Sequence, residues 1–252
     1  MLRCALHDGL SLQLNLIPTT LLYFPPQMPV LVFDLDDTLY PELSYVHSGF
    51  RAVAAFLSPL LEVPAETLAA GMIAEEATQG RGQVFDNVLR QYGRWTKALV
   101  TACLRTYRQH RPELQLYPDA ERCLSRFAAG PLYLVTDGHK EVQARKVAAL
   151  NLTGRVRHAY LTNRYGRHRA KPDPYVFGLI CQRESVASDQ VIYVGDNPRK
   201  DFVGIKPLGF RTMRILRGNY AHLEADAAHE ADRRIHTLDE LTETFVAELL
   251  GQ

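Results

Sequence analysis

The stretch Val30-Leu31-Val32-Phe33-Asp34-Leu35-Asp36-Asp37-Thr38 decides the fold of this chain. Its first four residues form a short apolar run rich in β-branched side chains, which is typical of a strand covered on both faces of a parallel sheet. The run stops abruptly at Asp34. Because Asp34 and Asp36 are two positions apart, both can face the same cavity at the end of the strand. Ligands of open parallel sheets bind beyond the carboxyl ends of the strands, so this stretch predicts a functional site.

Other predicted strands also end in polar residues that can carry chemistry. Residues 132–135 lead into Thr136, a strand near 159–161 precedes a loop with Lys171, and residues 191–194 lead into Gly195 and Asp196. Further short strands are predicted at 212–216 and near 234–235, and helices at 119–129, 139–150, 175–183 and from 238 onward. Alternation of strand and helix predicts the α/β class with a Rossmann-like, doubly wound parallel sheet.

A helical region separates the first strand from the others. Segments 46–60, 65–78, 83–91 and 95–109 each carry apolar residues three and four positions apart, which indicates helices. The sequence therefore predicts a Rossmann-like core at 28–43 and 116–252 and an inserted α-helical domain at 44–115. Pro41, Pro112 and Pro118 mark the joins, where hinges would let the inserted domain move relative to the core.

The residues at the strand ends suit a divalent metal and a phosphoryl group. Mg²⁺ prefers hard oxygen ligands, which the side chains of Asp34 and Asp196 and the backbone carbonyl of Asp36 can supply. Lys171 is a compact cation suited to a phosphoryl group, and Thr136 can donate a hydrogen bond to it. Two neighbouring carboxylates can divide the work between nucleophilic attack and proton transfer.

These residues resemble the four motifs of the haloacid dehalogenase-like (HAD) hydrolase superfamily, in order and at suitable spacing, over about residues 30–245. The motifs are Asp34-Leu35-Asp36-Asp37-Thr38, Thr136, Lys171 and Gly195-Asp196-Asn197-Pro198-Arg199-Lys200-Asp201. The helical insert after the first motif is similar to the cap of the subgroup that contains phosphoglycolate phosphatase, acylneuraminate phosphatases, nucleotidases and β-phosphoglucomutase.

The resemblance implies a role for each motif residue. Asp34 would attack phosphorus and form an aspartyl-phosphate, while Asp36 would protonate the leaving oxygen and then help water to attack. Asp196 would ligate the metal with Asp34 and Asp36. The remaining roles are phosphoryl binding by Thr136 and Lys171, support of the metal's outer shell or of Lys171 by Asp201, and shaping of the phosphate-binding turn by Asp137 and Gly138. Many relatives have Asn in place of Asp137, which leaves the role of this side chain open.

The implied activity is magnesium-dependent hydrolysis of a small phosphomonoester, such as a sugar phosphate or a nucleotide. A phosphomutase on the same scaffold keeps both Asp34 and Asp36, so the motifs do not exclude it. A dehalogenase does not need the acid at Asp36, and a P-type pump has Thr at that position together with membrane helices. A non-catalytic binding or regulatory protein of this fold would be expected to have lost a motif residue, and none is lost.

Composition gives no sign of a nucleic-acid or membrane partner. The 252 residues carry a net charge of +1, with 46% hydrophobic and 23% charged residues, so there is no electrostatic case for nucleic acid or an anionic membrane. No run of 18 apolar residues exists, and the N-terminus has no signal-peptide pattern. The four cysteines (Cys4, Cys103, Cys123 and Cys181) are far apart, which favours reduced thiols and a cytoplasmic protein. The oligomeric state stays open.

Several other features carry weaker expectations. The motif Gly80-Arg81-Gly82 is either a specificity loop of the cap or a plain turn, and Asp37 is expected to be structural rather than chemical. Residues 1–27 form an appendage in which the alternation over 10–17 indicates a half-buried strand; it is either dispensable or packed on the core. Candidate substrate contacts in the cap are His47, Arg51, Gln83 and Arg94. The histidines His222, His229 and His236 are spaced too widely on a helix for one metal, so they are expected on a solvated face or loop.

Overall fold

The computed structural model describes residues 28–251, and the expectations for residues 1–27 lie outside them. Six strands form one parallel sheet in the order β3-β2-β1-β4-β5-β6. This topology confirms the Rossmann-like α/β fold. The strands are β1 (Val30–Phe33), β2 (Leu132–Thr136), β3 (His158–Leu161), β4 (Val191–Gly195), β5 (Arg211–Ile215) and β6 (Arg233–Ile235).

Each face of the sheet is covered by helices, as the buried apolar strands require. In β1, Leu31 and Phe33 belong to one apolar cluster, while Val30 and Val32 belong to the cluster on the opposite face. The first cluster also contains residues of α5 (Pro118–Arg126), α6 (Lys140–Ala149) and α8 (Glu243–Leu250), and the second contains residues of α7 (Tyr175–Glu184). The central strands are therefore shielded on both sides, and only their ends reach polar surroundings.

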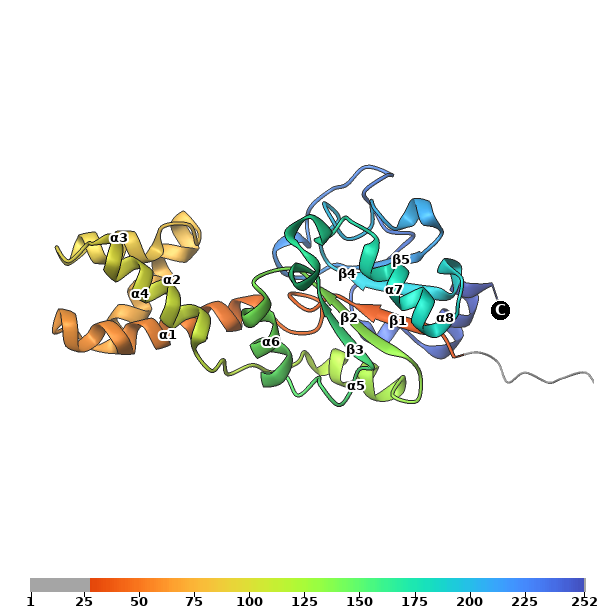
Figure 1. Ribbon diagram of the computed structural model, residues 1–252, viewed down its shortest axis with the longest axis horizontal. Coiled ribbons are helices and arrows are strands. Elements are labelled where there is room, and N and C mark those ends of the chain that lie inside the picture. The colour runs from red at the N-terminus through yellow and green to blue at the C-terminus, as the bar shows by residue number, and fades with distance from the viewer. Residues whose placement is uncertain (1–27, 252) are drawn as a thin grey trace, which may run out of the picture.

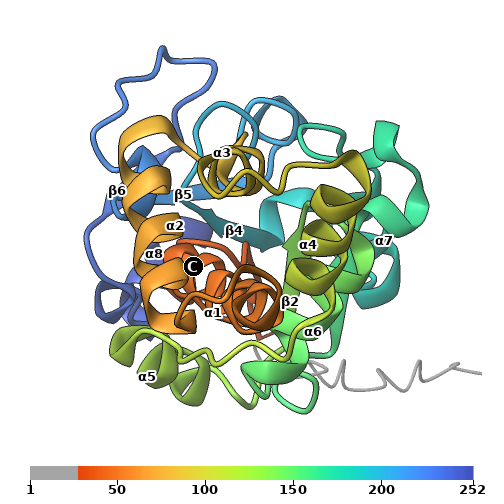
Figure 2. The ribbon, with the colours of Figure 1, turned by 90° about the vertical axis from the view of Figure 1, so that its left-hand side faces the viewer.

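Four helices form a bundle beyond the carboxyl ends of the strands (Figure 1). They are α1 (Glu42–Leu61), α2 (Ala65–Gln79), α3 (Val84–Gln91) and α4 (Lys97–Gln109), as the sequence predicted. The bundle has its own apolar core, with Phe50, Leu57 and Met72 fully or almost fully buried. Seen from the bundle end, these helices lie in front of the sheet (Figure 2).

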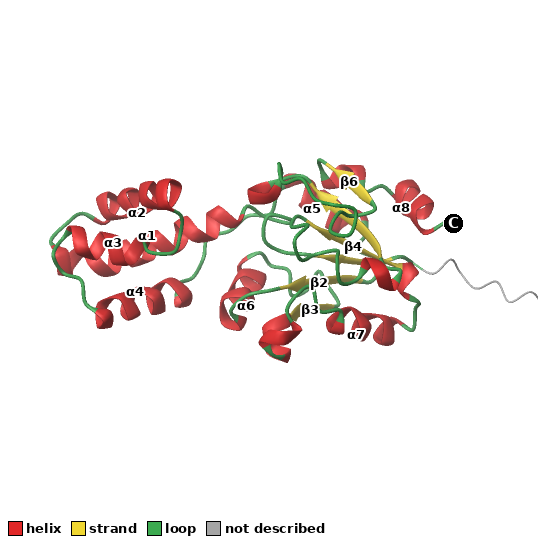
Figure 3. Cartoon of the chain, turned by 90° about the horizontal axis from the view of Figure 1, so that it is seen from above, coloured by secondary structure: helices red, strands yellow, loops and turns green. Residues whose placement is uncertain are grey.

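Two segments join the bundle to the sheet, namely the start of α1 and the extended chain after α4 (Figure 3). Helix α1 begins at Glu42, directly after Pro41, so the predicted boundary between 43 and 44 falls inside its first turn. Tyr45 of α1 packs edge-on against Tyr107 of α4 at 5.6 Å between ring centroids. On its other side the ring of Tyr45 lies 4.5 Å from the Lys146 Nζ of α6, so aromatic and cationic groups fill the junction.

The C-terminal helical segment differs from the single helix predicted from residue 238. A 3₁₀ turn covers Leu238–Glu240, and α8 begins separately at Glu243. The reason is that the chain carries two N-caps: Thr237 forms a capping box with Glu240, and the Thr242 side chain accepts a hydrogen bond from the Phe245 amide. Two caps five residues apart divide the segment into two short helices.

Two findings concern the cysteines and the helices of the described residues. Cys103, Cys123 and Cys181 are free thiols. No helix within residues 28–251 is both long and apolar enough to cross a membrane.

A buried carboxylate ties the start of α5 to two distant segments. Asp119 forms an ion pair with Arg217 at 2.9 Å and accepts a hydrogen bond of 2.8 Å from the Leu238 amide. Arg217 also donates to the backbone carbonyl of Thr38, in the segment that carries the first acidic residues. Burial opposes ionisation of Asp119, but the Leu238 amide and Arg217 outweigh it, so the pKa of Asp119 is held below its ordinary value of 3.8.

This arrangement makes a prediction for stability. A lowered folded pKa means that the ionised Asp119 stabilises the fold above pH 3.8 and loses that contribution as the pH falls through the folded pKa. We expect Asp119→Asn to lower the free energy of unfolding at pH 7 by about 1–3 kcal/mol, as measured by urea denaturation. The loss should shrink below pH 3.8. The exposed Asp189→Asn variant is the control, and a loss that is the same at pH 7 and pH 3 would contradict the assignment.

Candidate active site

The ends of β1, β2 and β4 border a polar cavity of about 300 Å³. Asp34 and Asp36 both line it, as predicted from their spacing, and so do Thr136, Asp137 and Asp196. The complete lining is Asp34, Asp36, Asp37, Glu42, Thr136, Asp137, Gly138, Asp196, Asn197, Lys200 and Tyr220. The cavity therefore collects residues from chain positions more than 180 residues apart, because parallel strands bring their carboxyl ends to one edge of the sheet.

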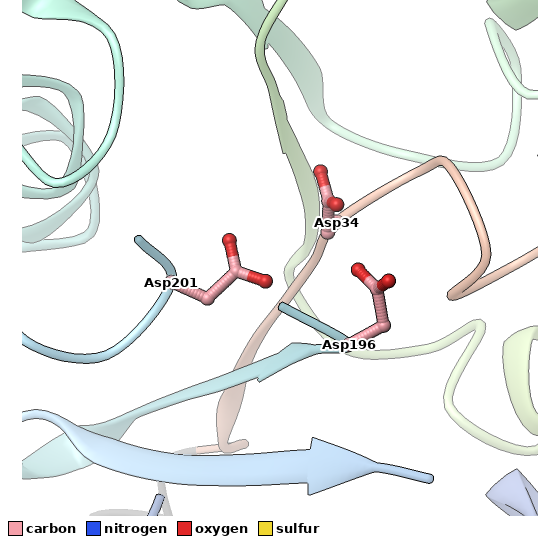
Figure 4. Close-up of side chains that lie close together, drawn as sticks. All are labelled: Asp34, Asp196 and Asp201. Carbon is pink, nitrogen blue, oxygen red and sulfur yellow. The ribbon is translucent and has the colours of Figure 1, made fainter. Parts of the chain in front are cut away.

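Three buried carboxylates converge beside this cavity (Figure 4). Asp34 follows β1, Asp196 follows β4, and Asp201 lies in the loop after β4. One carboxylate oxygen of each residue lies within 4.8 Å of the others. Such a set of hard oxygen atoms could hold a divalent metal ion. The resemblance implied Asp34, Asp36 and Asp196 as metal ligands and Asp201 as support for the metal's outer shell or for Lys171. The carboxylate cluster contains Asp201 and not the side chain of Asp36.

The electrostatics of this cluster fit a cation. Burial, and then the charge of Asp201, raise the pKa of Asp34 to about 6, although Lys171 opposes the shift. Burial and the charges of Asp201 and Asp34 raise the pKa of Asp196 to about 9. Both shifts express the cost of confining like charges in a poorly solvated place. A divalent cation among these oxygens would remove that cost, so the residues present fit a metal ion.

Lys171 supplies the cationic part of the cluster. Its Nζ lies 2.8 Å from the carboxylates of both Asp34 and Asp201, and only 1% of its side chain is exposed. The hydroxyl of Tyr193, on β4, lies 2.9 Å from the same Nζ. Burial opposes the charge on Lys171, but Asp201 and Asp34 outweigh burial and raise the pKa of Lys171 well above its ordinary value. Lys171 is thus a fixed cation directly beside the predicted nucleophile.

Asp201 is oriented from two sides. Its Oδ1 accepts a hydrogen bond from the Tyr193 hydroxyl at 3.2 Å, and its Oδ2 accepts one from the Asn197 amide at 2.9 Å. A Cβ on Gly195 would come within 2.5 Å of Oδ2, so only glycine at the end of β4 allows this approach. Asp201 contacts Lys171 at 2.8 Å, which is one of the two roles that the resemblance implied.

Asp36 is held by residues that sequence analysis missed. Its Oδ1 accepts from Lys146 Nζ at 2.7 Å and from the Tyr40 hydroxyl, and its Oδ2 accepts from Gln143 Nε2 at 2.9 Å. Burial opposes the charge, but Lys146 and these hydrogen bonds lower the pKa of Asp36. The side chain of Asp36 is therefore engaged away from the acidic cluster. The sequence did hold one signal for these partners of Asp36. Gln143 and Lys146 are two long polar side chains three residues apart, which places them on one face of a helix.

The polar side chains of Thr136, the last residue of β2, and of Asp137 are hydrogen-bonded to other side chains and to backbone. Thr136 Oγ1 accepts a hydrogen bond of 2.6 Å from Gln143. The Asp137 carboxylate accepts from the Thr162 hydroxyl at 2.6 Å and from the Lys171 amide at 3.1 Å, and it pairs with Lys200 at 3.3 Å. Asp137 therefore positions the Lys171 loop and the cavity-lining Lys200. The Asp137 carboxylate would repel a phosphoryl group. A phosphoryl group bound at this position would therefore contact the backbone of the turn.

The four bundle residues proposed as substrate contacts, His47, Arg51, Gln83 and Arg94, do not line this cavity in the described part of the chain. Arg94 borders a separate hollow with Leu60 and Leu61 at the far end of α1, about 30 Å away at 1.5 Å per helical residue. Arg51 lies 3.9 Å from Glu113. The bundle residue at the cavity is instead Glu42.

The contacts agree with the expectations that Asp37 is structural and that the spaced histidines lie in loops. Asp37 accepts hydrogen bonds from the Glu42 amide at 2.9 Å and the Asn219 amide at 3.2 Å, so it fixes the start of α1. His229 lies in a turn, and its Nδ1 is 2.8 Å from Oδ1 of Asp226.

Comparison with known proteins now adds to the geometry. A family model for haloacid dehalogenase-like hydrolases matches residues 28–209. The chain belongs to this family. It is 28% identical over 220 residues to a glyceraldehyde 3-phosphate phosphatase of Methanocaldococcus jannaschii, covering 84% of this chain and 95% of the relative. It is also 28% identical over 261 residues to a phosphoserine phosphatase of Thermus thermophilus, covering 88% of this chain and all of the relative.

Solved structures of haloacid dehalogenase-like proteins share the fold. A hydrolase of this family from Bacillus subtilis, solved with bound magnesium, superimposes with a TM-score of 0.59 at 17% identity and covers 90% of this chain and 100% of its own. A 2-haloacid dehalogenase from Pseudomonas syringae gives a TM-score of 0.58 at 23% identity, over 89% of this chain and 99% of its own. The arrangement of sheet and helices is therefore that of the family.

The close approach of two loops yields a prediction about Lys171. A Cβ on Gly204 would lie 1.7 Å from the backbone carbonyl oxygen of Pro172, the residue after Lys171. Because a backbone atom cannot swing aside, we expect Gly204→Ala to lower the free energy of unfolding by about 1–3 kcal/mol and to reduce any activity that needs Lys171. Gly178→Ala in α7 is the matched control, since its Cβ would meet nothing within 4 Å. Equal thermal midpoints for both variants would show that the loops separate without cost.

Proposed function

We propose that this protein is a magnesium-dependent phosphomonoester hydrolase that acts on a small phosphorylated metabolite through an aspartyl-phosphate intermediate. The observation that carries the proposal is the buried cluster of Asp34, Asp196 and Asp201 with the Lys171 ammonium 2.8 Å from Asp34. The names of the relatives, glyceraldehyde 3-phosphate phosphatase and phosphoserine phosphatase, support phosphatase activity.

Each group at the site has a place in this chemistry. Asp34, Asp196 and Asp201, with the backbone carbonyl of Asp36, would hold Mg²⁺ or its water ligands. The ion would supply Lewis-acid neutralisation of the charge on the phosphoryl oxygens. Lys171 fixes the orientation of Asp34, and Lys200 and Thr136 line the cavity where phosphoryl oxygens would lie. Fixed cations and donors of this kind stabilise the charge of the transferring group without reorganisation.

The proposed reaction has two displacements at phosphorus. A carboxylate oxygen of Asp34 attacks, the bond from phosphorus to the ester oxygen breaks, and the leaving alcohol takes a proton from Asp36. Water then gives a proton to Asp36 and attacks phosphorus, which breaks the aspartyl-phosphate bond, releases phosphate and restores Asp34. The lowered pKa of Asp36 suits the second step. The negative charge of an entering phosphoryl group favours protonation of Asp36 for the first step.

The proposal divides the chain as the sequence predicted, into a core at 28–43 and 116–252 and a cap at 44–115. The bundle stands at the carboxyl ends of the strands (Figure 1) and is joined to the core by only two segments (Figure 3). Movement about Pro41 and the segment before Pro118 would open the cavity for substrate and close it against water.

The nucleophile is tested by Asp34→Asn. We expect the variant to lose phosphate release by a factor of about 1,000 or more while keeping its circular dichroism spectrum, because an amide cannot form the acyl-phosphate. Colorimetric phosphate release from p-nitrophenyl phosphate and a metabolite panel, with and without magnesium, is the measurement. Retention of a tenth of the wild-type rate would exclude Asp34 as the nucleophile. Transfer of the phosphoryl group to a second hydroxyl without phosphate release would identify a phosphomutase.

The metal site is tested separately from activity. A ligand that binds only the folded state raises its stability, by about 2.7 kcal/mol at a hundred times its dissociation constant. We expect Mg²⁺ to raise the thermal midpoint of the wild-type protein and chelator to reverse the shift. Asp196→Asn should abolish the magnesium-dependent shift, and Asp189→Asn should keep it. A full shift in Asp196→Asn would place the ion elsewhere.

A further inference from the structure

A buried lysine lies behind the Asp36 carboxylate, outside the four motifs. Lys146, on α6, places its Nζ 2.7 Å from Asp36 Oδ1, and only 4% of its side chain is exposed. The rings of Tyr45 and Tyr40 lie 4.5 Å and 5.9 Å from the same nitrogen. Among the described residues, the cavity lining includes Asp36 but not Lys146. Lys146 therefore reaches a substrate in the cavity through Asp36 and not directly.

The surroundings of Lys146 leave Asp36 as its ionic partner. Removing an ammonium group from water is costly, and the described residues offer Lys146 one ion pair, with Asp36. The faces of the two tyrosine rings attract the cation but carry no net charge. Movement of the Asp36 carboxylate away from Lys146 would thus leave a buried charge unpaired. The ammonium therefore holds Asp36 in one place more strongly than a neutral donor would.

The two oxygens of Asp36 differ in what they can still accept. Oδ1 accepts from Lys146 and from the Tyr40 hydroxyl, which occupies both of its lone-pair directions. Oδ2 accepts from Gln143 Nε2 at 2.9 Å, and the described residues give it no second donor. The same Nε2 lies 2.6 Å from Oγ1 of Thr136, so Oδ2 lies on the side of the expected phosphoryl group. Oδ2 is thus the oxygen with room for a proton.

We infer that Lys146 is a positioning residue, which together with Tyr40 fixes Oδ1 of Asp36 and leaves Oδ2 to transfer the proton. This inference rests on the proposed function and names the residue that orients its acid and base. In the first displacement, the proton on Oδ2 passes to the ester oxygen as the bond from phosphorus to that oxygen breaks. In the second, a water oxygen bonds to phosphorus, the water proton passes to Oδ2, and the bond from phosphorus to Asp34 breaks.

Esters with different leaving groups test the inference, with the full-length protein and magnesium. An alkoxide needs a proton as it leaves, whereas p-nitrophenolate leaves without one, and kcat/KM covers the steps up to this departure. The alkyl probe is the phosphate that the wild-type protein hydrolyses fastest, from a panel that includes phosphoserine and glyceraldehyde 3-phosphate. We expect Lys146→Met to lower kcat/KM for this probe about 100-fold, the lower end of the range for general acid catalysis. For p-nitrophenyl phosphate the change should stay within about threefold, because the proton is not needed.

The return of the proton gives an independent signature. Because Oδ2 also takes the proton of water, Lys146→Met should slow hydrolysis of the aspartyl-phosphate whatever the ester. In stopped-flow absorbance, p-nitrophenolate should then appear in a burst that matches the amount of protein. The steady rate that follows should be about tenfold or more below that of the wild-type protein, with kcat and KM falling together.

A double-mutant cycle shows whether Lys146 acts through Asp36. Asp36→Asn removes the acid and base itself, so in that background Lys146→Met should change the remaining rate by less than about twofold. Tyr40→Phe removes one donor to Oδ1 and keeps the ring, so it should show the pattern of Lys146→Met more weakly; it also serves where Lys146→Met does not fold. Lys140→Met, which changes an exposed lysine of the same helix, is the control and should alter none of these values.

The outcomes separate this inference from the proposed function. If the wild-type protein hydrolyses esters but Lys146→Met and Tyr40→Phe slow alkyl and aryl esters in equal proportion, the lysine is structural and only the inference fails. The same holds if the effects of Asp36→Asn and Lys146→Met multiply. If the wild-type protein hydrolyses no ester with magnesium present, the proposed function fails first. A loss in kcat/KM confined to alkyl esters, and absent in the Asp36→Asn background, supports the inference.

Discussion

The site depends on one buried cation, the ammonium of Lys171, set between Asp34 and Asp201. Three buried carboxylates within 4.8 Å of one another would repel strongly in a poorly solvated place, and a single lysine offsets only part of that repulsion. Burial, together with the repulsion that remains, raises the pKa of Asp34 to about 6 and that of Asp196 to about 9. The fold thus holds an excess of negative charge at the ends of β1 and β4, which is the condition for binding a divalent cation and, with it, a phosphoryl dianion.

Backbone packing makes this concentration of charge possible. Gly195 lets Asp201 approach the end of β4, and Gly204 lets its loop touch the carbonyl of Pro172 beside Lys171. The Asp137 carboxylate accepts from the Lys171 amide, so the strand ends brace the lysine loop from the other side. Because β1, β2 and β4 are fully buried, these contacts stand on a rigid support, and glycines and a carboxylate together set the geometry.

The sequence was sufficient for what depends on local pattern. The apolar run before Asp34 and the helical periodicity of 46–109 located the sheet and the bundle, because period and strand ends are local properties. It did not find Lys146 and Gln143 as partners of Asp36, since their role arises only when α6 packs beside β1. It also named Arg94 as a candidate substrate contact, although Arg94 borders a hollow at the far end of α1, because the distance from Asp34 along a helix axis cannot be read from composition. The sequence predicted the helices and strands themselves. What it did not supply was which residues of different elements contact one another.

Helix α1 connects the two halves of the site. Asp37 follows Asp36 in the chain, and its carboxylate accepts from the amide of Glu42, so the first turn of α1 is fixed to the same loop that carries the acidic residues. Glu42 is therefore held beside the loop that carries Asp34 and lines the cavity, while Arg81 comes from the link between α2 and α3 and pairs with Glu42 at 2.9 Å. Movement of the bundle about Pro41 would thus pull against the hydrogen bond between the Asp37 carboxylate and the Glu42 amide. The loop that carries the acidic residues and the bundle would therefore be mechanically coupled.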